Sequence, residues 1–242
     1  MSNQFSTAGL SSINQLNQIN NILMQSMMRV SSGSKINSAS DDPSGYYSSK
    51  TLERDIKVAE VEERNMERER NAINSQNTIL DSASNIVSEM EALSQSASGV
   101  AVSDQEKAAI QQQVDELYSH LDQSLQNAGL GSAKDYGIEA TDLKITGSED
   151  ALQNSISKIR SSYDNLLSAN VSKGSEYNQK TIALQNLGPA IINLKSSLST
   201  IKDADIATES MKINNYKILQ NLSVQGVKNS QDVQKSALNL FG

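Results

Sequence analysis

The sequence predicts an α-dominated fold: an elongated antiparallel coiled-coil bundle of helices with one small β-hairpin. Apolar residues make up 37% of the 242 residues and aromatic residues only 4%, and tryptophan is absent. With few large side chains to fill a compact interior, helices that pack along narrow seams are favoured. Long stretches with apolar residues at helical spacing, almost free of Gly and Pro, indicate the same class.

The first 28 residues contain no charged side chain. Their apolar residues recur every three or four positions, which places them on one stripe of a helix. The remaining face is Asn, Gln and Ser, so neither high helix propensity nor ion pairs would support this helix alone in water. It therefore needs a partner. The stripe consists of Leu10, Ile13, Leu16, Ile19, Leu23, Met27 and Val30.

A segment dense in Ser, Gly, Asp and Pro follows, and we expect a connector over residues 34–44. Gly33 is placed to end the first helix. Ser40 to Asp42, followed by Pro43, is typical of an N-cap with proline in the first turn of the next helix. Two adjacent carboxylates without further ligands fit a cap better than a metal site.

Residues 46–98 contain neither Gly nor Pro and predict a helix about 80 Å long. Charges of alternating sign run from Lys50 to Arg70, including the pair Glu53/Lys57, which is typical of a solvated face or an inter-subunit surface. Ser103 with Glu106 then predicts a capping box that opens another helix, through about Asn127. The only histidine, His120, has no second imidazole or thiolate to join it at a metal site.

Alternation of Leu143 and Ile145 with Lys144 and Thr146 predicts the β-hairpin, near residues 133–147. Helical spacing returns from residue 149 to about 200. Pro189 in its middle is expected to kink that helix or divide it.

The last segment mirrors the first, with apolar residues at near-heptad spacing among Asn, Gln and Ser. Asp203 and Asp205 suit its positive N-terminal end. Pairing the two terminal helices, 1–33 with 205–242, is the simplest way to bury both stripes, and residues 45–204 would form the remaining helical region.

Composition and motifs exclude several function classes. The chain has no cysteine and a net charge of −7, and no basic cluster indicates nucleic-acid binding. No apolar run is long enough to span a bilayer, and the N-terminus lacks a secretory signal. Without a His-Glu-x-x-His motif or a Gly-rich phosphate loop, we expect no enzyme, no cofactor and no metal.

Two motifs resemble those of bacterial flagellins, and the resemblance spans essentially the whole chain. Residues 29–45 are similar to the flagellin signature after the first helix, and Asp203-Ala204-Asp205-Ile206-Ala207-Thr208-Glu209 matches the motif that opens the last helix. The ending, residues 237–242, is similar too, although Val233 stands where many flagellins have proline.

This resemblance implies that the terminal helices pair as the inner tube of a filament, called D0, and that the central helices with the hairpin form the surrounding D1. In flagellins with outer domains these are inserted near the hairpin, whereas here only about twenty residues separate the helices, so the chain resembles a minimal flagellin. It further implies export without a cleaved signal through the flagellar type III pathway, and a role in motility outside the cell. Implied partners are copies of the chain itself, an export chaperone, and the hook–filament junction and filament cap proteins.

In this interpretation the terminal helices order only when neighbouring copies bury their apolar residues. The expected self-assembly residues are Leu10, Ile13, Leu16, Leu23, Met27 and Val30 in the first helix, with Ile213, Leu219, Leu222, Val227, Leu238 and Leu240 in the last.

Flagellins detected by Toll-like receptor 5 carry an Arg-x-Arg-Glu-Leu-type segment in the first long helix of D1. Here Ser88 and Met90 stand where the arginines would fall, and Gln179 stands where an arginine is common on the returning helix. Losing bidentate donors from an interface costs affinity, so we expect weak or no recognition. The equivalent surface comprises Ser88, Met90, Glu91, Gln95 and Gln179.

Three alternatives stay open at this point. A hook–filament junction protein shares flagellin-like termini, although the motif at residues 203–209 favours flagellin proper. An enzyme embedded in a filament lacks the motifs named above. A generic coiled-coil adaptor explains the periodicity but neither specific motif.

Overall fold

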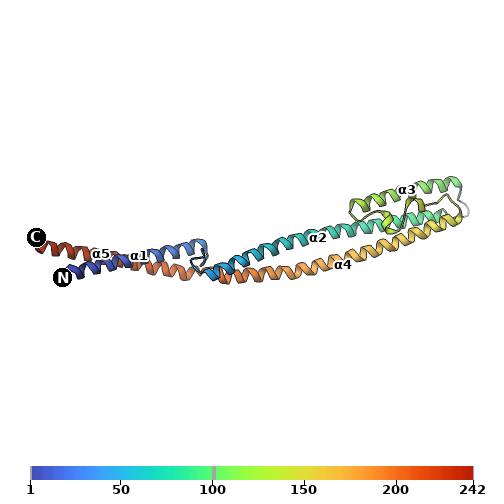
Figure 1. Ribbon diagram of the computed structural model, residues 1–242. Coiled ribbons are helices and arrows are strands. Elements are labelled where there is room, and N and C mark those ends of the chain that lie inside the picture. The colour runs from blue at the N-terminus through green and yellow to red at the C-terminus, as the bar shows by residue number, and fades with distance from the viewer. Residues whose placement is uncertain (1, 100–101, 242) are drawn as a thin grey trace. The chain divides into compact units, whose positions relative to one another are not determined.

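The computed structural model describes residues 2–99 and 102–241; the side chains of residues 2–9, 234, 237, 238, 240 and 241 lie outside that description. Helix follows helix along the chain (Figure 1). The elements are α1 (Ser2–Ser32), α2 (Pro43–Ser96), α3 (Asp104–Asn127), the 3₁₀ helices η1 (Ala133–Tyr136) and η2 (Ala140–Asp142), α4 (Glu149–Lys202) and α5 (Ile206–Phe241). They belong to two compact units, Met1–Ala59 with Ala190–Gly242, and Glu60–Pro189.

In the first unit α1 and α5 lie side by side and antiparallel (Figure 1). Two contacts define the register: Gln220 Nε2 donates to Asn20 Oδ1 at 2.7 Å, and Arg29 Nη1 lies 3.7 Å from Glu209 Oε1. Residue numbers rise along α1 as they fall along α5, as expected for antiparallel neighbours. α1 and α5 therefore pair with each other within a single chain.

The second unit has its own apolar core where α2, α3 and α4 meet. The largest fully buried side chains include Leu80 and Met90 of α2, Leu121 of α3, and Ile159 and Leu166 of α4. The segment between α3 and α4 adds Ile138, Leu143 and Ile145 to the same core. Ion pairs reinforce it at the surface, between Arg160 and Glu91 at 2.7 Å and between Lys180 and Glu69 at 2.7 Å.

The predicted β-hairpin near residues 133–147 is wrong. Among the described residues this segment forms η1 and η2 with irregular chain, and no β-ladder. Leu143 and Ile145 do point inward while Lys144 and Thr146 are exposed, as alternation suggests. The backbone, however, bonds to helix side chains instead of a second strand: Lys144 N donates to Ser155 Oγ at 2.9 Å, and Ile145 N donates to Gln111 Oε1 at 2.7 Å. The alternation of buried and exposed side chains alone does not reveal which groups form hydrogen bonds with the backbone.

Most helix boundaries agree with the sequence signals. The capping box is present, because Ser103 accepts from Glu106 N and Glu106 accepts from Ser103 N. Gly33, with φ of 69°, follows the end of α1 in the left-handed conformation that ends helices. Pro189 does not divide α4, which continues through it to Lys202.

Among the described residues, none of the helices combines the length and hydropathy needed to cross a membrane.

Candidate functional site

The paired terminal helices contact each other along one face of each helix, here called the inner seam. On α1 this face includes the buried Ile19 and Ser26 and the half-buried Leu16, Leu23 and Val30. On α5 it includes the buried Glu209 and the half-buried Ile213, Tyr216, Gln220, Ser223 and Val227. Both sets recur at intervals of three and four residues, as a helix–helix seam requires.

A second apolar stripe on α1 remains exposed, here called the outer seam of α1. It starts at Leu10 and Ile13, which are 63% and 43% exposed. Three turns later it continues at Met24, Met27 and Met28, which are 57%, 51% and 52% exposed. Asn17 and Asn21 occupy the turns between, so the stripe carries no charge.

α5 has an outer seam of its own. Met211, Ile218 and Leu222 are separated by seven and four residues and are 60%, 58% and 57% exposed. Val233 follows on the same face, three turns further along, and Leu219 lies exposed at its flank. Each terminal helix therefore presents two apolar faces, of which the partner in the same chain covers one.

The structure thus divides the expected self-assembly residues into two sets. Leu16, Leu23, Val30, Ile213 and Val227 lie in the inner seam. Leu10, Ile13, Met27, Leu219 and Leu222 are exposed. Leu238 and Leu240 lie outside the described side chains.

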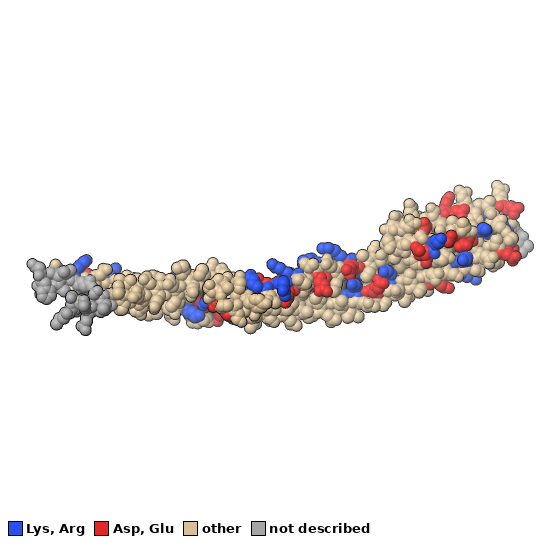
Figure 2. All heavy atoms as spheres, viewed as in Figure 1, with Lys and Arg blue, Asp and Glu red and all other residues tan. Residues whose placement is uncertain are grey.

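Charge is sparse over this helix pair. In Figure 2 the surface of the pair is mostly uncharged on the face shown, whereas blue and red atoms gather over α2, α3 and α4. The first 28 residues supply no charge at all. The surface of α1 up to Met28 therefore loses little hydration energy when it is buried, because no ion there has to leave water.

The two sequence motifs meet at the base of the pair. Ser34 and Asp203 form an isolated antiparallel bridge, in which Lys35 N donates to Lys202 O at 2.7 Å and Ala204 N donates to Gly33 O at 2.9 Å. The Ser34 hydroxyl also donates to Lys202 O, at 3.0 Å. The chain thus leaves α1 and enters α5 through hydrogen-bonded backbone.

The adjacent carboxylates of the connector cap local backbone, as the sequence indicated. Asp41 Oδ2 accepts from Ser38 N at 2.8 Å and from Asn37 N at 3.0 Å, and the Ser38 N–H is the first cause that lowers the Asp41 pKa. Asp42 Oδ1 accepts from Gly45 N at 3.0 Å at the start of α2. A Cβ at Gly45 would lie 2.4 Å from Asp42 Oδ2 and 2.6 Å from Ile36 Cδ1. Gly45 therefore allows the connector to fold onto the first turn of α2.

Glu209 is the one charged side chain buried in the inner seam among the described residues, at 6% exposure. Its Oε1 accepts from Lys212 Nζ at 2.8 Å and faces Arg29, while Oε2 is buried without a hydrogen-bond partner in the described structure. The bond from Lys212 lowers the Glu209 pKa, with Ser26 and Arg29 acting in the same direction against burial. This cluster joins α1 to the first turn of α5.

A second acidic group holds α2 to the end of α4. Glu53 Oε1 accepts from Lys202 Nζ and Oε2 accepts from Lys50 Nζ at 2.8 Å. These bonds, from Lys202 first, lower the pKa of Glu53 to about 2.

Two family models match this chain. The model of the bacterial flagellin N-terminal helical region matches residues 5–131, and that of the C-terminal helical region matches residues 164–241. The chain belongs to the bacterial flagellin family. No curated protein matches it. Only residues 132–163 separate the two flagellin regions, so this is a minimal flagellin without outer domains, a structural subunit of the flagellar filament type.

The receptor-equivalent residues of this flagellin are not all at the surface. Ser88, Gln95 and Gln179 are exposed, and Gln95 donates to the half-buried Glu91, which also pairs with Arg160. Met90, in contrast, is fully buried in the core. Its side chain is therefore not part of an exposed surface.

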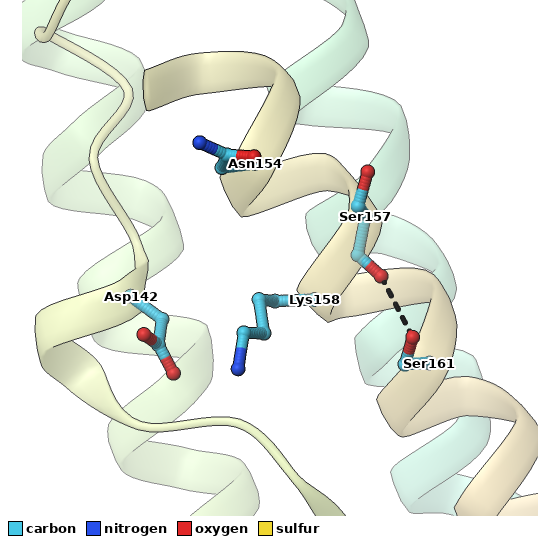
Figure 3. A pocket seen from close by; sticks show the side chains of 5 residues that line it. All are labelled: Asp142, Asn154, Ser157, Lys158 and Ser161. Carbon is cyan, nitrogen blue, oxygen red and sulfur yellow. Dashed lines mark hydrogen bonds between the residues drawn. The ribbon is translucent and has the colours of Figure 1, made fainter. Parts of the chain in front are cut away.

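The flagellin chain also has a polar hollow of about 430 Å³ beside α4, lined by Asp142, Asn154, Ser157, Lys158 and Ser161. Lys158 and Asp142 extend toward each other across it, and Ser161 donates to the Ser157 carbonyl (Figure 3). Among the described residues no three His, Cys, Asp or Glu side chains gather as a metal site would require. The hollow is open and carries one acid facing one base, which is an ordinary surface arrangement.

Sequence reasoning named some outer-seam residues of this flagellin but did not separate them from the inner seam, and it missed Met24, Met28, Met211 and Ile218. A signal was present, because each terminal helix carries a second set of apolar residues displaced around the helix from the first. It also missed the contact between Arg29 and Glu209, which lie in different motifs.

Proposed function

We propose that this chain is a subunit that polymerises with copies of itself into the flagellar filament, with the outer seams of α1 and α5 as the contact surface. One observation carries the proposal: the inner seam is covered within the chain, while large apolar side chains of both outer seams stay exposed. Large apolar side chains that line up exposed along a helix are typical of interaction surfaces. Flagellin membership specifies the partner as another copy.

Two outer seams on one helix pair allow contacts on two sides. A surface that joins different faces of successive copies, without closing into a ring, generates a helical filament. The scarcity of charge favours dense packing of copies, while Asn, Gln and Ser remain able to hydrogen-bond to neighbours. In this proposal α1 and α5 form D0, and the core of α2, α3 and α4 belongs to D1.

We further propose that α1 and α5 become fully ordered only during assembly. Their contact within the chain is a single narrow seam that contains Asn20, Ser26, Glu209 and Gln220, so it buries less apolar area than a three-helix core. Binding of neighbours would stabilise the ordered state by mass action. If α1 and α5 order only on assembly, the subunit would not polymerise before export through the flagellar type III pathway, where the export chaperone would bind it. Growth of the filament would then take place between the hook–filament junction proteins and the filament cap protein.

Deleting residues 203–242 tests the proposal. The truncated chain lacks α5 and is expected to form no sedimenting filaments, while circular dichroism still shows the helices of the second unit. Filaments from the truncated chain would refute it. Negative-stain microscopy of the full chain separates the alternatives, because long self-polymerised filaments are expected of a filament subunit and not of a hook–filament junction protein.

A further inference from the structure

The methionines of this chain are distributed unevenly between core and surface. Six of the seven lie among the described residues. Met90 is fully buried and Met66 is half-buried, both in α2. The other four, Met24, Met27, Met28 and Met211, are each more than half exposed, and all belong to the outer seams.

The exposed methionines also lie near one another along the helix pair. Met27 precedes Arg29 by two residues, and Met211 follows Glu209 by two. Because Arg29 and Glu209 face each other in an antiparallel pair, Met27 and Met211 stand at the same level of it. Met24 and Met28 are the neighbours of Met27 within one turn of α1. The four methionines therefore lie within about one turn of the same level, on the outer seams of both helices, close to the base of the pair.

We propose that these four methionines are a modification site for hydroperoxides, whose oxidation controls whether the outer seams assemble. The inference rests on the proposed assembly function and adds a chemical control to it. In the reaction the thioether sulfur attacks one oxygen of hydrogen peroxide and the O–O bond breaks. That oxygen stays on sulfur as a sulfoxide, and its proton passes to the departing hydroxide, which leaves as water. The sulfur is oxidised by two electrons, and hydrogen peroxide is reduced to water.

Oxidation of these methionines replaces flexible apolar side chains in the outer seams with polar ones. An unbranched thioether fills irregular gaps between packed helices, whereas a sulfoxide is a polar, chiral group that disrupts methionine-rich interfaces. A sulfoxide buried between copies without a donor costs free energy. The exposed positions react while the isolated subunit keeps its fold, because Met90 is shielded in the core of the second unit. Assembly is thus lost before the subunit itself unfolds.

The test treats the chain, with both terminal helices present, with dilute hydrogen peroxide and locates sulfoxides by peptide mass spectrometry. Met24, Met27, Met28 and Met211 are expected to oxidise at least about tenfold faster than Met90. Sedimentation then gives the critical concentration for polymerisation, which is expected to rise at least about tenfold, since burial of one methionine already contributes about that factor. Treatment with methionine sulfoxide reductases, one for each sulfoxide epimer, is expected to return the critical concentration to that of the untreated chain.

The matched control is the variant Met24→Leu, Met27→Leu, Met28→Leu, Met211→Leu, which keeps apolar volume and retains Met66 and Met90. Its polymerisation is expected to be insensitive to peroxide; sensitivity equal to that of the wild type would overturn the inference. Unchanged assembly of oxidised wild-type chain would overturn it too, and would leave the proposed function standing, because the untreated chain still forms filaments. If the untreated chain forms none, the proposed function fails as well. Recovery of assembly when the reductases repair the oxidised wild-type chain supports the inference without any substitution.

Discussion

Leu222→Lys offers the sharpest test of the outer seams, because it alters a proposed contact between copies without altering the inner seam of the chain. Leu222 is 57% exposed in the subunit and lies on the face of α5 that points away from the inner seam. Lysine has nearly the helix propensity of leucine. The unfolding free energy of the isolated subunit should therefore change by no more than about 0.5 kcal/mol.

The effect on assembly is much larger. Full burial of a leucine contributes about 1.5–3 kcal/mol, so covering its exposed half contributes roughly 1–1.5 kcal/mol. A lysine ammonium buried there without a carboxylate adds a penalty of about 3 kcal/mol. Each 1.4 kcal/mol changes an equilibrium tenfold, so the critical concentration should rise by about a thousandfold.

Sedimentation across a concentration series measures the critical concentration, with Gln179→Lys as control because Gln179 is exposed on α4. Equal critical concentrations for the two variants would refute the assignment of the outer seam. Leu16→Lys and Leu23→Lys should also block assembly far more than Gln179→Lys. Since both leucines are half-buried in the inner seam, these two variants should in addition lose helicity in the subunit, which Leu222→Lys should not.

Four further predictions concern Gly45 beside the connector, the buried Glu209, the ion-paired Glu53 and the receptor-equivalent surface. Gly45→Ala should destabilise the chain by about 1–3 kcal/mol in urea unfolding, opposite to the usual gain of alanine in a helix, because its Cβ would overlap Asp42 and Ile36; a stabilised variant would contradict this. Glu209→Gln should cost about 2 kcal/mol by leaving Lys212 and Arg29 without their carboxylate. Arg29→Met with Glu209→Leu should unfold closer to wild type, because the Lys212 side chain that remains is 46% exposed; equal losses in both would argue against a buried pair. The Glu53 pKa of about 2 lies below its ordinary 4.5, so its contribution is complete above pH 4.5 and is lost as pH falls toward 2. With solvent screening we expect about 1 kcal/mol, visible as a shallower acid dependence of unfolding in Glu53→Gln. Reporter cells bearing Toll-like receptor 5 should respond more weakly to this chain than to an arginine-bearing flagellin, and Ser88→Arg should raise the response; a response equal to that flagellin's would contradict the prediction.

Local signals in the sequence were sufficient wherever a structure depends on neighbouring residues. The capping box of Ser103 and Glu106, the helix end at Gly33 and the caps at Asp41 and Asp42 each act within three or four positions, so their residue types identify them. The prediction of a β-hairpin was wrong for the converse reason. Lys144 and Ile145 bond to Ser155 and Gln111, which lie eleven and thirty-four residues away, and no local pattern announces that choice.

The sequence by itself determined that the terminal helices are apolar, nearly uncharged and in need of partners, and its two motifs indicated the family. Tertiary structure decided which apolar residues the chain covers for itself. Leu23 and Leu222 look equivalent in a periodic pattern, yet one lies against the paired helix and the other faces outward. Periodicity reports that a face is apolar, but only the rotation of one helix against the other shows which face is already buried. The exposed methionines of the outer seams, together with the meeting of Arg29 with Glu209, follow from that rotation and from the antiparallel register.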